Sequence, residues 1–206
     1  MLRNRILDRD CSKSRFDFRW RCKDRVARLR FHPQNAHIFH QHRKGEYEIT
    51  YGVIDRKNQK FYIYLSKVFQ GINNAQKQYN WLITDCECYP KNKEIEELFD
   101  QKYCWLSGEE LTDIVVKEDF QWIWGCLCGF QKDISLEEVL MHSLPSSQDY
   151  NRYYQNPVSL LHPLSSVEIV PSDSSWTLII SKDNTIIDSY IKMYPKSEDL
   201  SAFNQR

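Results

Sequence analysis

The chain has 206 residues, of which 41% are hydrophobic and 27% are charged, and its formal net charge is zero. This composition is that of a globular protein, which excludes a chain too polar to fold. The longest apolar runs, such as residues 176–180, are too short to span a bilayer, so the sequence predicts no transmembrane segment.

The zero net charge conceals two segments of opposite sign. Residues 1–44 contain 13 Lys or Arg and four Asp, a net charge of +9, whereas residues 45–206 contain 15 Lys or Arg and 24 Asp or Glu, a net charge of −9. The first segment shows neither helical nor strand periodicity. We therefore expect residues 1–45 to be a basic, disordered arm or an extension of the reading frame.

These two interpretations of the arm remain open. Arginines among aromatic residues neutralise phosphates and stack on bases, which predicts a salt-sensitive nucleic-acid-binding tail. Alternatively, residues 43–46 can be encoded by a purine-rich ribosome-binding sequence, with translation starting near Ile49. Under the first interpretation the candidate nucleic-acid contacts are Arg15, Arg19, Arg21, Arg25, Arg28 and Arg30.

Regular patterns begin near residue 46. Alternating, aromatic-rich stretches predict strands at 47–54, 79–88, 103–106 and 120–130. Apolar residues at helical spacing predict a helix over residues 58–70, with Gly71 at its end. A lysine- and glutamate-rich stretch, residues 91–99, predicts a short solvated helix.

Two capping boxes mark further helix starts, because a Ser side chain and a Glu three residues later satisfy each other's backbone amides. They are Ser107 with Glu110, and Ser135 with Glu138. Residues 143–166 show no period and predict a long loop of the functional or mobile kind.

The C-terminal part predicts a hairpin of strands 167–171 and 176–181, then a helix from Asn184 that Pro195 ends. Residues 196–206 are expected to be a polar tail. The sum of these elements is an α+β domain over residues 46–195. We expect a single mixed or antiparallel sheet of five to six strands, with helices packed mainly on one face.

Two Cys-x-Cys pairs, Cys86/Cys88 and Cys126/Cys128, are the candidate metal ligands. Residues two apart on a strand share a face, so on neighbouring strands four thiols could meet and hold a thiophilic ion such as zinc. On a straight strand, however, side chains two residues apart are separated by about 7 Å. Buried core thiols are therefore the favoured interpretation, and an odd total of seven cysteines argues against a disulfide framework.

The tryptophans are predicted to pack on the sheet rather than to bind a ligand. Trp81, Trp105, Trp122, Trp124 and Trp176 all fall on predicted strands. By strict alternation, Trp122 and Trp124 share a face with Cys126 and Cys128.

Short motifs spread along the chain are Tyr51-Gly52-Val53, Val68-Phe69-Gln70-Gly71-Ile72, Tyr79-Asn80-Trp81, Ser107-Gly108-Glu109-Glu110-Leu111 and Asp173-Ser174-Ser175. From Tyr51 onward the chain thus resembles a small uncharacterised domain family of unknown function found in Gram-positive bacteria. The resemblance implies no activity and transfers no catalytic residue.

The sequence contains no phosphate-binding glycine loop, nucleophile elbow or metalloprotease motif, so we expect a non-enzymatic protein without a cofactor. Because no apolar region follows the basic N-terminus as in a secretory signal, we expect the protein to be cytoplasmic. Its acidic domain favours binding of a basic protein partner, in the manner of immunity proteins that block nuclease toxins. The alternatives are nucleic-acid association through the arm and thiolate metal binding.

Overall fold

Eight strands and six α-helices are present in the computed structural model, which describes residues 49–58 and 63–206. The strands are β1 (Tyr51–Asp55), β2 (Ile63–Tyr64), β3 (Asn80–Cys88), β4 (Tyr103–Ser107), β5 (Gln121–Phe130), β6 (Val167–Ser172), β7 (Trp176–Ser181) and β8 (Glu198–Asp199). The helices are α1 (Leu65–Gly71), α2 (Lys93–Phe99), α3 (Gly108–Lys117), α4 (Leu136–Val139), α5 (Asn184–Met193) and α6 (Leu200–Phe203), with 3-10 turns η1 (Ala75–Gln78) and η2 (Ser147–Arg152).

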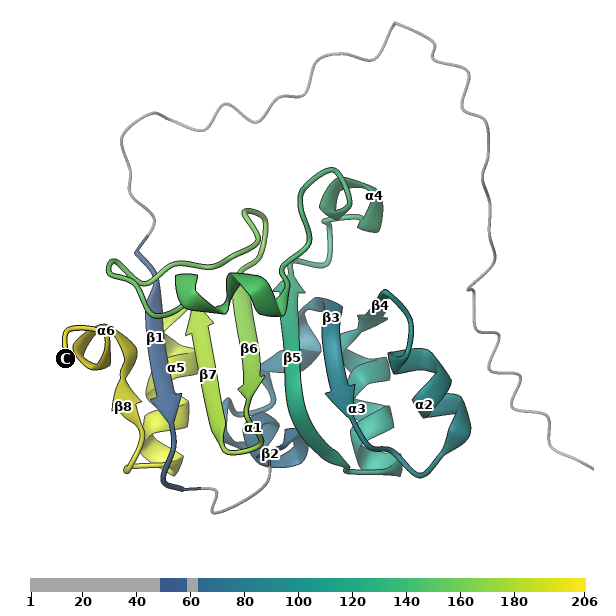
Figure 1. The fold of residues 1–206 in the computed structure, drawn as a ribbon, viewed down its shortest axis with the longest axis horizontal. Helices are drawn as coiled ribbons and strands as arrows, with labels where there is room; N and C mark the ends of the chain where they lie inside the picture. The colour runs from purple at the N-terminus through teal and green to yellow at the C-terminus, as the bar shows by residue number, and fades with distance from the viewer. Residues whose placement is uncertain (1–48, 59–62) are drawn as a thin grey trace, which may run out of the picture. The chain divides into compact units, whose positions relative to one another are not determined.

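All strands join one sheet in the order β4-β3-β5-β6-β7-β1-β8, with β2 paired to β5 (Figure 1). Each pairing is antiparallel. The predicted α+β class and the antiparallel sheet are therefore confirmed. The strand number exceeds the predicted five to six because β2 and β8 have two residues each, too few to show a period.

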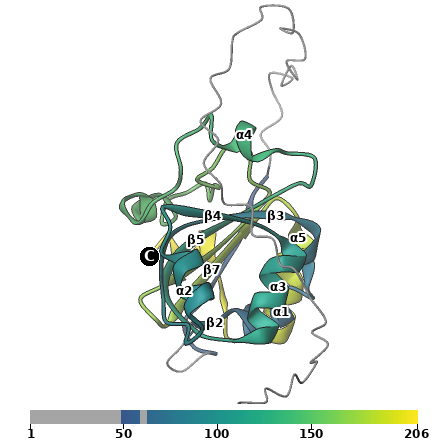
Figure 2. The ribbon, with the colours of Figure 1, turned by 90° about the vertical axis from the view of Figure 1, so that its right-hand side faces the viewer.

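Helices cover one face of this sheet, as predicted, and Figure 2 shows α1, α3 and α5 together on one side. The main core, which we define as the large buried cluster on this face, receives Leu65, Leu111 and Tyr190 from the three helices. Trp81 and Ile83 of β3 meet them from the sheet. No helix of the described residues has the length and apolarity needed to cross a membrane.

The opposite face is covered mainly by the segment 143–166, together with α4 and α6. Glu168 of β6, fully buried, holds this segment. Its carboxylate accepts hydrogen bonds from the Tyr153 hydroxyl (3.0 Å), the amides of Leu161 and His162 (3.0 Å each) and the Ser165 hydroxyl (2.8 Å). A buried charge is tolerated when its acceptor sites are filled in this way.

Both predicted capping boxes are present. The Glu110 amide donates to Ser107 Oγ at 3.2 Å, and Glu110 Oε2 accepts from the Ser107 amide at 2.8 Å. Ser135 and Glu138 make the same exchange at the start of α4. These helix starts are thus set by residues three apart, without help from distant parts of the fold.

The helix predicted over residues 58–70 is shorter in the structure. Of the predicted range, residues 59–62 lie outside the described residues. Ile63 and Tyr64 pair with Trp122 and Gln121 of β5, so α1 begins at Leu65. The helical periodicity holds from Leu65 onward, whereas at Ile63 and Tyr64 a strand pairing with β5 takes the place of the predicted helix.

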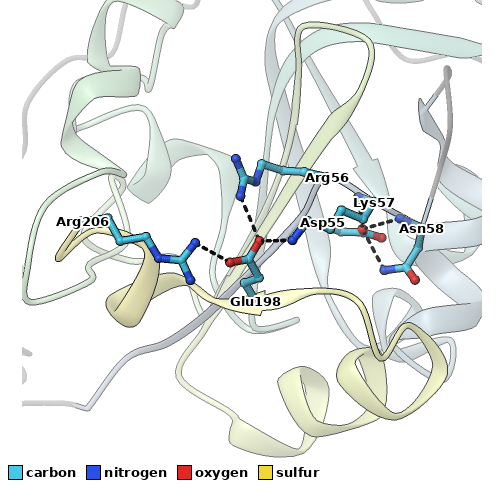
Figure 3. Close-up of polar contacts among 6 residues, drawn as sticks. All are labelled: Asp55, Arg56, Lys57, Asn58, Glu198 and Arg206. Atoms are coloured by element: carbon cyan, nitrogen blue, oxygen red, sulfur yellow. Dashed lines mark hydrogen bonds and ion pairs between the residues drawn. The ribbon is translucent and has the colours of Figure 1, made fainter.

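Residues 196–206, expected to be a polar tail, form β8 and α6. Glu198 and Asp199 pair with Ile54 and Val53 of β1, and Leu200 is fully buried. Glu198 accepts ion pairs from Arg56 (2.9 Å), Lys57 (3.1 Å) and Arg206 (2.7 Å), as Figure 3 shows. These three cations hold the pKa of the Glu198 carboxyl at about 2.

Candidate functional site

Two β-bulges interrupt the pairing of β3 with β5 near the end of β3. Thr84 pairs with Cys126, Glu87 with Trp124, and Cys88 with Trp122. The first interval has an extra residue on β3 and the second has an extra residue on β5. Asp85, in the first interval, has a left-handed backbone with φ of 46°, which is uncommon for a non-glycine residue and is typical of a bulge.

The bulges divide the four candidate cysteines between the two faces of the sheet. An extra residue reverses the alternation of side chains that follow it. Cys86 and Cys88 accordingly pack against the main core, whereas Cys126 and Cys128 lie in the buried clusters of the opposite face. The strands are neighbours, as a shared thiolate site required, but the four thiols do not meet. Within the described residues, no group of three or more His, Cys, Asp or Glu side chains is placed to hold a metal ion.

The second bulge separates the two tryptophans that alternation placed together. Trp122 lies in the main core, where its ring is 5.3 Å from that of Phe99. Trp124 instead contacts Tyr150 of η2, with ring centroids 5.4 Å apart. The prediction of a common face with Cys126 and Cys128 is therefore wrong for Trp122. All five predicted strand tryptophans do lie on strands.

Cys86 and Cys88 are much closer than a straight strand allows. Their sulfur atoms are 3.3 Å apart, not the expected 7 Å or so, because the bulge at Asp85 turns both side chains toward each other. Cys86 donates this hydrogen bond. The hydrogen bond with Cys88 and burial raise the pKa of the Cys86 thiol, with smaller contributions from neighbouring groups.

A cavity of about 750 Å³ opens beside these bulges. Aromatic side chains, Phe99, Trp124 and Tyr150, line it together with Cys86 and the loop that joins α2 to β4. Asp85, Glu87 and Asp100 supply three carboxylates to its lining, and Lys102 supplies one cation. The site thus combines aromatic faces with net negative charge, which suits a cationic group rather than an anion.

Tyr150 connects the cavity to the long segment 143–166. Its hydroxyl accepts a hydrogen bond from the Gly125 amide at 3.2 Å, and burial raises the pKa of the phenol. Behind it, burial raises the pKa of the Cys126 thiol to about 12. The segment predicted to be a long loop thus contributes Tyr150 to the cavity. No sequence signal joined this residue to Asp85 or Asp100.

The cavity belongs to a strongly acidic part of the domain, residues 85–119, which we call the acidic edge. It comprises the end of β3, α2, the edge strand β4 and α3, and these elements lie together at one end of the sheet (Figure 1). It contains 11 Asp or Glu and four Lys, so it carries −7 of the net −9 of residues 45–206. Ten of the 11 carboxylate side chains are exposed, and Glu118 is half-buried.

The candidate nucleic-acid contacts of the arm, Arg15, Arg19, Arg21, Arg25, Arg28 and Arg30, lie outside the described residues. The same holds for the boundary expected at residue 45. Their interpretation stays a prediction.

The fold and cavity define an α+β domain with an antiparallel sheet and an acidic edge. A family model described as a protein of unknown function (DUF2691) matches residues 51–204. The chain belongs to this family, and the resemblance inferred from Tyr51 onward is confirmed. The match extends over β8 and α6, so the C-terminal segment is part of the family's domain. No curated protein and no solved structure matches the chain significantly.

Proposed function

We propose that this chain is a non-enzymatic cytoplasmic protein that binds a basic protein partner through its acidic edge. The observation that carries the proposal is the concentration of −7 net charges in residues 85–119, nearly all on exposed side chains. A compact patch of one sign accelerates encounter with a surface of the opposite sign and orients it.

The cavity supplies a specific contact within this acidic edge. A Lys or Arg side chain of the partner can contact the aromatic lining of the cavity, Trp124 and Tyr150, whose faces attract cations. Asp85, Glu87 and Asp100 then neutralise its charge. An acidic surface that attracts the partner and a cavity that binds one of its side chains would act as in immunity proteins, which block cationic toxins with an acidic surface. The comparison is with that class of protein as a whole.

The test compares two charge-reversed variants of equal net charge. The first carries Glu96→Lys and Glu97→Lys, both on the exposed side of α2. The control carries Glu137→Lys and Asp188→Lys, exposed positions on α4 and α5. Each protein is immobilised, retained proteins are identified by mass spectrometry, and the purified candidate partner is titrated by calorimetry.

We expect a basic protein that binds the wild type and the control variant but loses at least tenfold in affinity for the α2 variant, which corresponds to about 1.4 kcal/mol. Equal affinity of the purified partner for both variants would contradict the proposal. Thermal unfolding of each variant verifies that the exchanges leave the fold intact.

Two other functions are separate predictions. Nucleic-acid binding through the arm predicts salt-dependent affinity that disappears when residues 1–44 are deleted. Thiolate metal binding predicts stoichiometric metal that is lost on Cys86→Ser or Cys126→Ser. Because Cys86 and Cys126 lie on opposite faces, the second hypothesis now requires that the two pairs act separately.

A further inference from the structure

We propose that Cys86 and Cys88 form a reactive dithiol, which closes to an intrachain disulfide by exchange with a cationic or neutral low-molecular-weight disulfide that enters the cavity. This inference concerns the thiols themselves and does not depend on the proposed protein partner.

The first support is the distance between the two sulfurs. At 3.3 Å they are in contact, whereas a disulfide bond is about 2.05 Å long. Closure therefore requires the two sulfurs to approach by about 1 Å. Cys86 and Cys88 share a face because they are two residues apart, and the bulge at Asp85 places that face against the main core.

The second support is access. Cys104, Cys126 and Cys128 are buried, with exposures of 5%, 0% and 0%. Cys86 and Cys88 are half-buried, and Cys86 lines the 750 Å³ cavity. Thiol–disulfide exchange needs a thiol that the incoming disulfide can reach. Among the described cysteines, this pair meets that condition best.

The exchange balances in two steps. One sulfur of the pair attacks one sulfur of the disulfide RSSR, a mixed disulfide forms, and RS⁻ leaves and takes the proton that this thiol released. The second sulfur of the pair then attacks the first, its proton passes to the second leaving RS⁻, and the Cys86–Cys88 bond forms. Two protein thiols are oxidised and one disulfide is reduced to two thiols.

The charge of the cavity selects the reagent. Asp85, Glu87 and Asp100 face one lysine, Lys102, so the lining repels anions. We expect cystamine, a cationic disulfide, to react faster than the neutral 2-hydroxyethyl disulfide, and both to react faster than the anionic oxidised glutathione.

The test treats the full chain with each disulfide and maps unreduced peptides by mass spectrometry, which also separates Cys11 and Cys22. The expected product is the peptide containing Cys86 and Cys88 with the loss of two hydrogens. Cys86→Ser and Cys88→Ser each remove one partner of the bond, so each variant should stop at a mixed disulfide on the remaining cysteine. Cys104→Ser is the matched control and should still form the product.

Three outcomes would overturn the proposal, and none depends on the variants. They are unreacted thiols at both positions, mixed disulfides on both without closure, and a bond from either cysteine to Cys104. Faster closure in urea-unfolded protein than in native protein would also contradict it, because the argument rests on the folded arrangement.

Discussion

At the scale of single residues, the most constrained group is the carboxylate of Glu168. It is fully buried and accepts four hydrogen bonds, all of them from the segment 143–166. The Tyr153 hydroxyl is one of these donors and is itself buried. Removing one donor leaves a buried acceptor without a hydrogen-bond partner, and this unpaired acceptor accounts for most of the free-energy cost.

We predict that Tyr153→Phe lowers the free energy of unfolding by about 1–3 kcal/mol, because Glu168 loses a donor that water cannot replace. Chemical denaturation measures the change. The same substitution at Tyr89, which is 60% exposed, should change stability by less than about 0.5 kcal/mol. Equal losses for the two variants would show that Tyr153 acts through something other than its hydroxyl.

Residues also show where strand alternation was informative and where it was not. It placed the cysteines and tryptophans on strands correctly, because composition and period are properties of the sequence itself. It could not place Cys86 and Cys88 relative to Cys126, because two bulges change their faces and these depend on the pairing of β3 with β5. The bulge at Asp85 could not be predicted, since no sequence signal distinguishes Asp85 from an ordinary strand residue.

At the scale of elements, helix starts were the best predicted features, since a capping box is a local exchange between residues three apart. Short elements were missed for the opposite reason. β2, β8 and α6 have two to four residues, and each forms because a partner segment stabilises it. The cavity was missed as well, because it needs Tyr150 beside Trp124 and these residues meet only in the folded chain.

Contact between α3 and η1 depends on the absence of a side chain at Gly108. A Cβ atom there would lie 2.0 Å from the Gln76 carbonyl oxygen, which also accepts the Trp81 indole N–H at 2.9 Å. We predict that Gly108→Ala lowers the free energy of unfolding by about 1–3 kcal/mol, because backbone must move. Thermal unfolding of the wild type and the variant measures this loss of stability.

The matched control lies in the same helix. Val116 is 81% exposed, and Val116→Ala should leave stability within about 0.5 kcal/mol of the wild type. An unchanged melting temperature for Gly108→Ala would contradict this prediction, because it would show that η1 can move away from α3 without a loss of stability.

The junction of β8 with β1 predicts a dependence on acid. The pKa of Glu198 is lowered to about 2 from an ordinary value of 4.5, so its ion pairs contribute stability above pH 4.5 and lose that contribution as the pH falls toward 2. Glu198→Gln removes the titrating group. The unfolding free energy of the variant should therefore fall less than that of the wild type between pH 5 and pH 2. Parallel pH curves for the two proteins would refute this.

At the scale of the whole molecule, the sequence alone shows that residues 1–44 are basic and residues 45–206 are acidic. Only the folded structure shows that most of the negative charge lies on the acidic edge. The net charges of +9 and −9 cancel in the full chain. We predict that residues 45–206 alone bind polylysine more tightly than the full chain at low salt, because the basic segment no longer offsets the acidic domain. The difference in affinity should shrink as added salt screens the charges of the basic segment and of the acidic domain.

Fluorescence titration at several salt concentrations measures this effect, and circular dichroism confirms that the shortened protein is folded. Equal affinities at low salt would show that residues 1–44 do not influence the potential of the domain.

The attachment of the segment 143–166 through one carboxylate also has a kinetic consequence. The amides of Leu161 and His162 both donate to Glu168, so neither can be released to solvent unless this anchor opens. Their hydrogen–deuterium exchange should therefore report one shared opening free energy, and Tyr153→Phe should lower it for both amides together. A long irregular loop is ordinarily expected to exchange residue by residue. Here a stretch near its end should open as one cooperative unit, with the slow exchange more typical of a sheet.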